Sequence, residues 1–338
     1  MDKITQLTNT LGRGEIPDRH RVKDVFGDIM SGRVTTEDLK AFLLMLKDKE
    51  TPEIISGAAQ AMREKMIKVD VRDCPDEVVL DTCGTGGNSL STFNISTAAA
   101  FVVSACGIKV AKHGNRAVSS RFGSADVLGE LGLNLGHPPD KVCEIIRRIG
   151  IGFLFAPLYH PAMKYAACAR KELAIRTIFN ILGPLCNPAG ADTQVLGVYD
   201  RRLLSLVSQA LADLGCRRAF VVYSPQGLDE VSVEGPTMIA DLHRGKIRNY
   251  SLEPKDFGID SLPLSAIAPG DGAQENARMI LDALNGKDKA RADAVVINAA
   301  LGIVAAGKAD DFRQAVSLAR QAISCGGALN KLNALIDG

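Results

Sequence analysis

From residue 78 onward, short apolar runs alternate with longer amphipathic segments, and this alternation limits the possible folds more than any other feature. The run VVLD ends in the glycine turn CGTGG, which is typical of a strand entering a tight turn. A helix is expected from about Ile95 to Cys106, followed by a second strand at IKVAK. Further strand and helix pairs are GFLFA with Pro161 to Leu173, and QVLGVY with RRLLSLVSQALADLG, before a last strand, RRAFVVY. This order predicts a mainly parallel central sheet flanked by helices.

The first part of the chain predicts helices only. Apolar residues recur at helical spacing at Val22, Val25, Phe26 and Ile29. Thr35 can cap the next helix, and Pro52 suits the first turn of another. We therefore expect a small helical domain at residues 1–72 and a larger α/β domain at residues 73–338. A helical segment near residues 164–186 is expected to join the helical domain.

Two later regions depart from the alternation. Residues 229–252 contain the short runs DEVSVEG, TMIADL and KIRNYSL, separated by turn signals, which predict a small antiparallel excursion. The last 65 or so residues predict helices again.

Composition excludes several classes of protein. The formal net charge of +1 argues against a protein that coats nucleic acid. The amino-terminal segment has no apolar core of a signal peptide, and no run of about 18 apolar residues predicts a membrane span. The eight cysteines form no Cys-x-x-Cys pair, which indicates reduced thiols in a cytoplasmic protein.

The segment DTCGTGGNSLSTFNIST, residues 81–97, is the first candidate site. Its glycines follow a strand and precede a helix, so that backbone N–H groups at the helix start can face an anion. Neither the dinucleotide motif nor the Walker motif fits the spacing. A phosphate or pyrophosphate site is predicted, and a plain glycine turn with a polar helix start is the alternative.

The segment KVAKHGNRAVSSRFGSAD, residues 109–126, is strongly basic. No Asp or Glu occurs between Asp81 and Asp126, so the two segments together would form a cleft of one charge sign. Such a cleft concentrates an anionic substrate. A solvated basic loop remains the alternative.

Adjacent carboxylates at Asp229 and Glu230 form a third candidate. Neighbouring residues of a strand point to opposite faces, so sharing one metal requires a turn, which the preceding SPQG supplies. Mg²⁺ commonly binds one or two carboxylates together with substrate phosphates and water. A surface turn is the alternative.

The block ARKELAIRTIFNILGPLCNP, residues 169–188, places Arg170, Arg176 and Asn180 on or near a helix with apolar neighbours. An arginine can bind a carboxylate through two parallel hydrogen bonds. An arginine with structural contacts at a domain boundary is equally consistent with the local sequence.

In combination and in this order, the segments resemble the anthranilate phosphoribosyltransferases of tryptophan biosynthesis, in the nucleoside phosphorylase-like fold superfamily. The resemblance runs along nearly the whole chain through GAAQAMR, GTGG…TFNIST, KHGNRAVSS, GSAD, FLFAPLYHPAMK, RKELAIRTIFNILGPLCNP and GLDEVS. KHGN and GPLxNP are specific to the family, whereas related pyrimidine nucleoside phosphorylases have similar glycine loops. The resemblance implies a homodimer that transfers the phosphoribosyl group of phosphoribosyl pyrophosphate (PRPP) to anthranilate with Mg²⁺.

The resemblance also implies roles for individual residues. The PRPP site would comprise Gly84, Gly87, Asn88, Thr92, Asn94, Ile95, Ser96, Thr97, Lys112, His113, Gly114, Asn115, Arg116, Ala117, Val118, Ser119, Ser120 and Ser124. Mg²⁺ would be held by Ser96, Asp229 and Glu230, and anthranilate by Gly84, Asn115 and Arg170. No catalytic base is evident, and His113 is the one candidate.

The chain departs from the family pattern at a few positions. Asn88 and Ser89 replace the usual Asp-Gly, Phe122 replaces a serine, and Tyr223-Ser224 stands where His-Gly is common. Three alternatives therefore stay open: the same chemistry on another aromatic amine, a pyrimidine nucleoside phosphorylase, and a non-catalytic nucleic-acid-binding relative.

Overall fold

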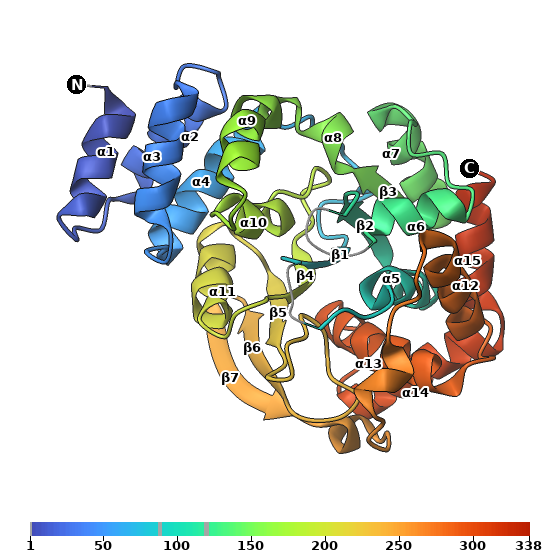
Figure 1. The fold of residues 1–338 in the computed structure, drawn as a ribbon. Coiled ribbons are helices and arrows are strands. Elements are labelled where there is room, and N and C mark those ends of the chain that lie inside the picture. The colour runs from blue at the N-terminus through green and yellow to red at the C-terminus, as the bar shows by residue number, and fades with distance from the viewer. Residues whose placement is uncertain (1, 87–89, 118–121) are drawn as a thin grey trace.

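The chain forms an amino-terminal helical bundle and a larger part built on a seven-stranded sheet (Figure 1). The computed structural model describes residues 2–86, 90–117 and 122–338. Helices cover both faces of the sheet, and most of its strands are parallel. The predicted fold class, a helical part with a larger α/β part, is confirmed.

The bundle consists of four helices, α1 (Lys3–Gly12), α2 (Arg19–Ile29), α3 (Thr36–Leu46) and α4 (Pro52–Lys65). Each begins where the local sequence supplies a cap. The side chains of Asp2, Asp18, Thr35 and Thr51 accept hydrogen bonds from first-turn N–H groups. The expected cap at Thr35 and the expected helix start at Pro52 are both confirmed.

The sheet has the strand order β3-β2-β1-β4-β5-β6-β7. Its strands are β1 (Val79–Gly84), β2 (Lys109–Gly114), β3 (Ile151–Phe155), β4 (Thr193–Gly197), β5 (Arg218–Tyr223), β6 (Thr237–His243) and β7 (Lys246–Leu252). The first five are parallel, and β6 and β7 are antiparallel. The order reverses between β1 and β4, which is where ligands bind in open sheets of this type.

The antiparallel excursion is confirmed for TMIADL and KIRNYSL, but the expectation of a third run at DEVSVEG was wrong. Residues 229–235 form no strand. Side chains satisfy their backbone N–H groups instead: Val231 donates to Asn298 Oδ1 and Ser232 to Thr237 Oγ1, each over 2.9 Å. A buried backbone without a partner strand needs such substitutes.

One face of the sheet is covered by α5 (Ile95–Ala105), which packs against α13 (Lys289–Ala305). The carboxyl-terminal helices α12 (Ala273–Leu284), α14 (Phe312–Ser324) and α15 (Gly327–Ile336) complete this layer. Helices α6 (Ser124–Glu130) and α7 (Pro139–Ile149) lie at the β3 side (Figure 1). Short 3₁₀ turns lie at Pro161–Met163, Gly183–Leu185, Pro254–Phe257 and Leu264–Ile267.

The opposite face is covered by α11 (Leu203–Asp213), and its core continues into the helical bundle. The ring of Phe26 lies 6.0 Å from that of Phe42 and 5.9 Å from that of Phe179, centroid to centroid. Phe179 belongs to α10 (Phe179–Leu182), which follows α8 (Ala156–Tyr159) and α9 (Lys164–Leu173).

Helix α9 packs on α3 of the bundle, and Lys40 Nζ pairs with Glu172 Oε2 over 2.7 Å. The division of the chain between residues 72 and 73 stays a prediction. No helix in the described part of the chain is both long and apolar enough to cross a membrane.

Candidate active site

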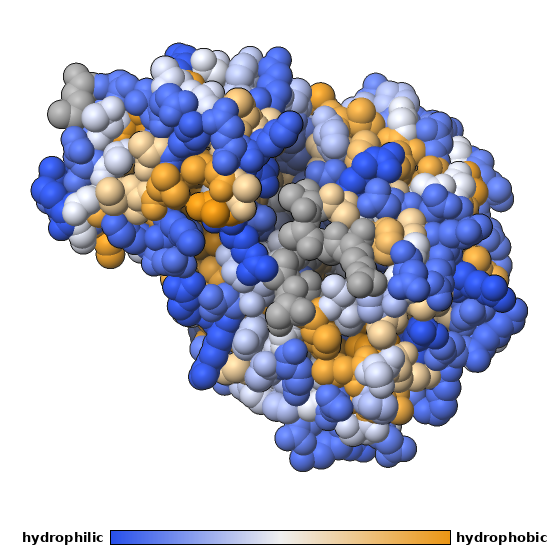
Figure 2. All heavy atoms as spheres, in the orientation of Figure 1, coloured by the Kyte–Doolittle hydropathy of each residue, from blue (hydrophilic) through white to orange (hydrophobic). Residues whose placement is uncertain are grey.

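A cavity of about 1100 Å³ opens at the carboxyl ends of β1 and β2 and extends to α9 and α10. The space-filling view shows the molecule hollowed beside the helical bundle (Figure 2). The loop after β5 and the start of α5 also reach its wall. Four predicted segments therefore meet at the cavity. They are the glycine loop that follows β1, the basic segment (residues 109–126), the acid pair (Asp229 and Glu230) and the arginine block (residues 169–188).

Most of the predicted site residues line this cavity. They are Gly84, Thr92, Asn94, Ser96, Thr97, Lys112, His113, Gly114, Asn115, Arg116, Ala117, Ser124, Arg170, Asp229 and Glu230. Ile95 does not line it, because its side chain is fully buried in the core. Gly87, Asn88, Val118, Ser119 and Ser120 lie outside the described residues, as do Ser89 and Arg121.

The acid pair, Asp229 and Glu230, is hydrogen-bonded to two points of the segment 81–97, which was expected to hold a phosphate. The Gly86 N–H donates to Asp229 Oδ2, and the Ser96 N–H at the start of α5 donates to Glu230 Oε1, each over 3.2 Å. Both carboxylates therefore lie within hydrogen-bond reach of the amides of the glycine loop and the helix start. A phosphate bound at neighbouring amides of the same segment would lie next to both acids.

Two glycines make room for the acid pair. A side-chain carbon on Gly84 would lie 2.6 Å from Asp229 Oδ2, and one on Gly197 would lie 1.6 Å from the Asp229 carbonyl oxygen. Any larger residue at either strand end would displace the 229–230 turn. The loop is also fixed from the other side, because the buried hydroxyl of Ser224 donates to the Glu230 carbonyl oxygen over 2.7 Å. The departure at Ser224 thus adds an anchor that a glycine would lack.

Burial and mutual repulsion act on the acid pair. Burial, followed by the charge of Asp229, raises the pKa of Glu230 to about 8, and burial also raises the pKa of Asp229. Glu230 therefore retains its proton at neutral pH when no cation lies beside the acids. A divalent cation would displace that proton.

Lys112 is the buried cation of the site. Its Nζ donates to the Thr82 carbonyl oxygen over 2.6 Å, which directs the side chain from β2 toward β1. Burial lowers the pKa of Lys112, and the neighbouring negative charge of Asp81 opposes this shift. The two groups stabilise each other's charged form.

Two histidine rings lie together at the cavity wall. The centroids of His113 and His160 are 5.0 Å apart. Burial lowers the pKa of His113 to about 3 and that of His160 to about 4. Both imidazoles are therefore neutral at pH 7. Within the described part of the chain, their buried Nε2 atoms have no hydrogen-bond partner.

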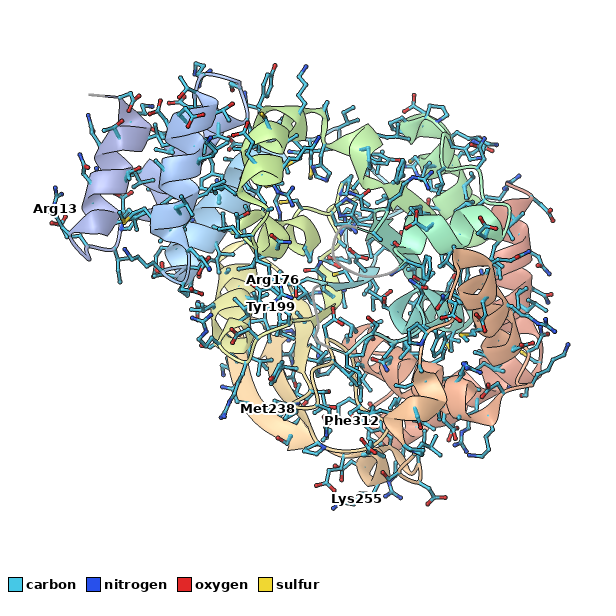
Figure 3. The ribbon with its side chains drawn as sticks, in the orientation of Figure 1. Arg13, Arg176, Tyr199, Met238, Lys255 and Phe312 are labelled. Atoms are coloured by element: carbon cyan, nitrogen blue, oxygen red, sulfur yellow. The ribbon has the colours of Figure 1, made fainter. Side chains whose placement is uncertain are left out.

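Two arginines of the RKELAIR block reach the cavity over aromatic rings. The guanidinium of Arg170 lies 5.4 Å from the ring centroid of Phe179, and that of Arg176 lies 4.6 Å from that of Tyr199 (Figure 3). Burial lowers the pKa of Arg170. The aromatic contacts hold two cations at the end of the cavity nearest the helical bundle.

Several lining residues had not been assigned a role from the sequence. Met62 and His160 lie in the quoted motifs GAAQAMR and FLFAPLYHPAMK, so the motifs could have found them. Asn276 of α12 comes from the carboxyl-terminal helices and lies in no motif. Phe122, a departure from the family pattern, also lines the cavity, and its carbonyl oxygen accepts a hydrogen bond from Asn94 Nδ2 over 3.2 Å.

Two family models match nearly the whole chain. The helical bundle domain of the glycosyl transferase family matches residues 5–66, and the a/b domain of the same family matches residues 76–329. The matched ranges coincide with the bundle and the sheet-containing part described above.

Named relatives match at similar length. An anthranilate phosphoribosyltransferase of Syntrophobacter fumaroxidans is 50% identical over 92% of both chains. The crystal structure of the Thermus thermophilus anthranilate phosphoribosyltransferase has a TM-score of 0.92 at 40% identity and covers 100% of this chain and 99% of its own. The Saccharomyces cerevisiae enzyme, in complex with PRPP and Mg, has a TM-score of 0.88 at 30% identity, with 99% and 97% covered.

Replacing Glu230 should change how stability depends on pH. The folded pKa of about 8 lies above the usual 4.5, so the stabilisation from the bound proton is complete below pH 4.5 and is lost as pH rises toward 8. Without metal or substrate, the free energy of unfolding should fall by up to roughly 1 kcal/mol per pH unit in this window. Urea unfolding in EDTA at pH 5 and pH 7.5 should show a shallower fall for Glu230→Gln. The exposed neighbour variant Glu234→Gln should keep the wild-type slope, and an unchanged slope in Glu230→Gln would contradict the prediction.

Proposed function

The chain belongs to the anthranilate phosphoribosyltransferase family, and from this premise we propose how its residues divide the work of the reaction. The protein is a pentosyltransferase that uses Mg²⁺ to transfer the 5-phosphoribosyl group of PRPP to the amine of anthranilate. The products are N-(5-phosphoribosyl)anthranilate and pyrophosphate, in tryptophan biosynthesis. The single observation that carries the residue assignments is the acid pair, hydrogen-bonded to the glycine loop and the start of α5.

The phosphates of PRPP are assigned to the end of the cavity formed by the glycine loop and the basic segment. The amides near Gly84 and the start of α5 would donate to phosphate oxygens, with Lys112 as the cation. The remaining assignments follow the family: Gly87, Asn88, Thr92, Asn94, Ile95, Ser96, Thr97, His113, Gly114, Asn115, Arg116, Ala117, Val118, Ser119, Ser120 and Ser124. For Ile95 only the backbone is available, since the side chain is in the core.

The residues present fit Mg²⁺. Asp229, Glu230 and the Ser96 hydroxyl offer oxygen donors only, and all three line the cavity. Within the described ranges no group of three or more His, Cys, Asp or Glu could enclose a metal, so phosphate oxygens and water would complete the coordination. When bound, the ion would supply charge neutralisation for the departing pyrophosphate.

Anthranilate is assigned to the opposite end of the cavity, next to α9 and α10. Arg170 would bind the carboxylate, and Gly84 and Asn115 would contact the substrate between the two ends. The apolar surface of Phe179 lies beside Arg170 and suits an aromatic ring.

The mechanism we propose needs no strong base. The amine of anthranilate is largely unprotonated at neutral pH, and its lone pair can attack the anomeric carbon directly. His113 remains the one candidate base, but its lowered pKa makes it a weak proton acceptor. The protein contributes by holding the donor at one end and the acceptor at the other, so that attack occurs opposite the leaving group with inversion.

Activity itself is the first test. Anthranilate fluorescence should decrease in the presence of PRPP and Mg²⁺, with release of pyrophosphate, and should stay constant in EDTA. Loss of PRPP binding by calorimetry would overturn the assignment of the phosphate end. PRPP binding without turnover would indicate another aromatic amine as the acceptor. Turnover of thymidine or uridine with phosphate would support the phosphorylase alternative, and a gel shift at physiological salt the nucleic-acid-binding one.

The substitution Arg170→Ala should weaken the binding of anthranilate far more than the binding of PRPP. Loss of a charged hydrogen-bonding partner in a buried site costs about 2–3 kcal/mol, so KM for anthranilate should rise by roughly 30- to 150-fold. PRPP affinity, measured by calorimetry, should change less than about threefold, since Arg170 is assigned to the other end of the cavity. Arg148→Ala, an exposed arginine on α7, is the matched control and should behave as wild type. An effect confined to PRPP would contradict the assignment.

We also propose a cytoplasmic homodimer. Two large apolar side chains are exposed on the packed pair α3 and α9: Leu44 at 54% and Tyr165 at 44%. Burying such groups against a second copy would remove them from water. Light scattering at micromolar concentration should give twice the chain mass, and Leu44→Lys with Tyr165→Lys should give the monomer. Ile16→Lys, an exposed apolar position outside these helices, should leave the dimer intact.

A further inference from the structure

The ladder between β1 and β2 stops before the strands end. Paired residues are Val79 with Lys109 and Leu80 with Val110. In contrast, β1 pairs with β4 as far as Gly84, and β2 pairs with β3 as far as Gly114. The two strands that carry the glycine loop and the basic segment thus separate where the site begins. Their facing backbone groups then need other partners.

Side chains supply these partners. Asp81 is fully buried, and its Oδ1 accepts from the His113 N–H over 3.2 Å. Its Oδ2 accepts from Asn187 Nδ2 over 2.8 Å, and the same amide nitrogen donates to the Ala111 carbonyl oxygen over 2.7 Å. Asn187 Oδ1 in turn accepts from the Ala189 N–H over 2.9 Å. Two side chains therefore connect β1, β2 and the GPLCNP segment behind the cavity.

The same opening contains Lys112. Its Nζ donates to the carbonyl oxygen of Thr82 over 2.6 Å and to the Thr82 hydroxyl over 3.5 Å. Both are neutral acceptors, and the nearby negative charges, first that of Asp81 and then those of Cys83 and Glu230, oppose the lowering of the Lys112 pKa by burial. Asp81 and Asn187 do not line the cavity, whereas Lys112 and His113 do, so these two residues can transmit an effect of Asp81 to the substrate.

We propose that Asp81, held by Asn187, is a positioning residue that fixes the backbone of the Lys112–His113 segment and so directs Lys112 toward the phosphates of PRPP. This inference rests on the proposed assignment of Lys112 to PRPP. On this proposal, Asp81 influences the binding of PRPP although it contacts neither substrate. The acceptor end, at Arg170, should be insensitive to it.

Asp81→Asn should lower donor affinity in particular. An asparagine at position 81 would point its NH₂ group at another donor, either the His113 N–H or Asn187 Nδ2, so one hydrogen bond would be lost. The side-chain amide of Asn187 cannot rotate by 180° to compensate, because it would then lose its hydrogen bonds with Ala111 and Ala189. We expect KM for PRPP to rise roughly 10- to 100-fold and KM for anthranilate to stay within about twofold.

The matched control is Asp293→Asn. Asp293 is also a buried carboxylate, paired with Lys289 and Arg320, but it lies on α13 and does not line the cavity. Its replacement should lower Tm without changing KM for PRPP. If Asp81→Asn lowers Tm in the same way and leaves KM for PRPP at the wild-type value, Asp81 is merely structural and the proposal is wrong.

Two further variants test whether Asp81 acts through Lys112. The exchange Asp81→Asn with Asn187→Asp returns the negative charge and restores every hydrogen bond of the pair except the one to Ala111, so it should recover most of the PRPP affinity. In a Lys112→Met background, Asp81→Asn should have little further effect on PRPP binding. The full effect in that background would show that Asp81 does not act through Lys112.

Calorimetry separates this inference from the proposed function. If the wild type does not bind PRPP with Mg²⁺, the assignment of the phosphate end fails, and the inference fails with it. If the wild type binds PRPP and the Asp81 variant binds equally well, only the positioning role is overturned. Should Asp81→Asn fail to fold, Asn187→Ala takes its place, since it keeps the charge and removes the clamp. It should raise Kd for PRPP by a smaller factor, and an unchanged Kd would overturn the role.

Discussion

Several charged side chains must be buried at one edge of the sheet, and the rest of the structure depends on how this is achieved. Asp81 and Glu230 interact electrostatically with the buried Lys112, and Asp229 acts in turn on Glu230. Uncompensated burial of any of these charges would be costly. The protein uses backbone amides, one asparagine and a raised pKa of Glu230 to satisfy the acids. The excess of negative charge is the reason that we propose Mg²⁺ to bind there.

The fold provides the geometry that this arrangement needs. Parallel strands bring their carboxyl ends to one edge, so that the loops after β1, β2, β4 and β5 meet there. Glycine at the ends of β1 and β4 lets the acid turn approach the sheet closely. The separation of β1 from β2 opens the edge of the sheet. Asp81 and Asn187 provide hydrogen-bond partners for the backbone groups of His113 and Ala111 that this separation exposes. The acceptor end is built by a different set of elements, α9 and α10 with the helical bundle.

The residues that depart from the family pattern make different kinds of contact in the structure. Ser224 donates to the backbone of Glu230, so this replacement of a glycine adds a contact beneath the acid pair. Phe122 packs at the cavity wall, and its backbone still accepts from Asn94. Tyr223 is partly buried in the core that joins the sheet to the helical bundle. None of these positions obstructs the hydrogen bonds between the acid pair and the glycine loop.

The sequence by itself determined the elements whose signals are local. Alternating apolar runs predicted the parallel strands, Thr35 and Pro52 marked helix starts, and the residue types of the glycine loop, basic segment and acid pair indicated an anion and metal site. Only the tertiary structure decided that residues 229–235 are a loop stabilised by Asn298, that β6 and β7 extend the main sheet, and that His160 and Asn276 reach the cavity. It alone also showed that Asp81 turns inward to Asn187. These features depend on contacts between residues 30 to more than 100 positions apart, and no spacing or periodicity along the chain encodes such contacts.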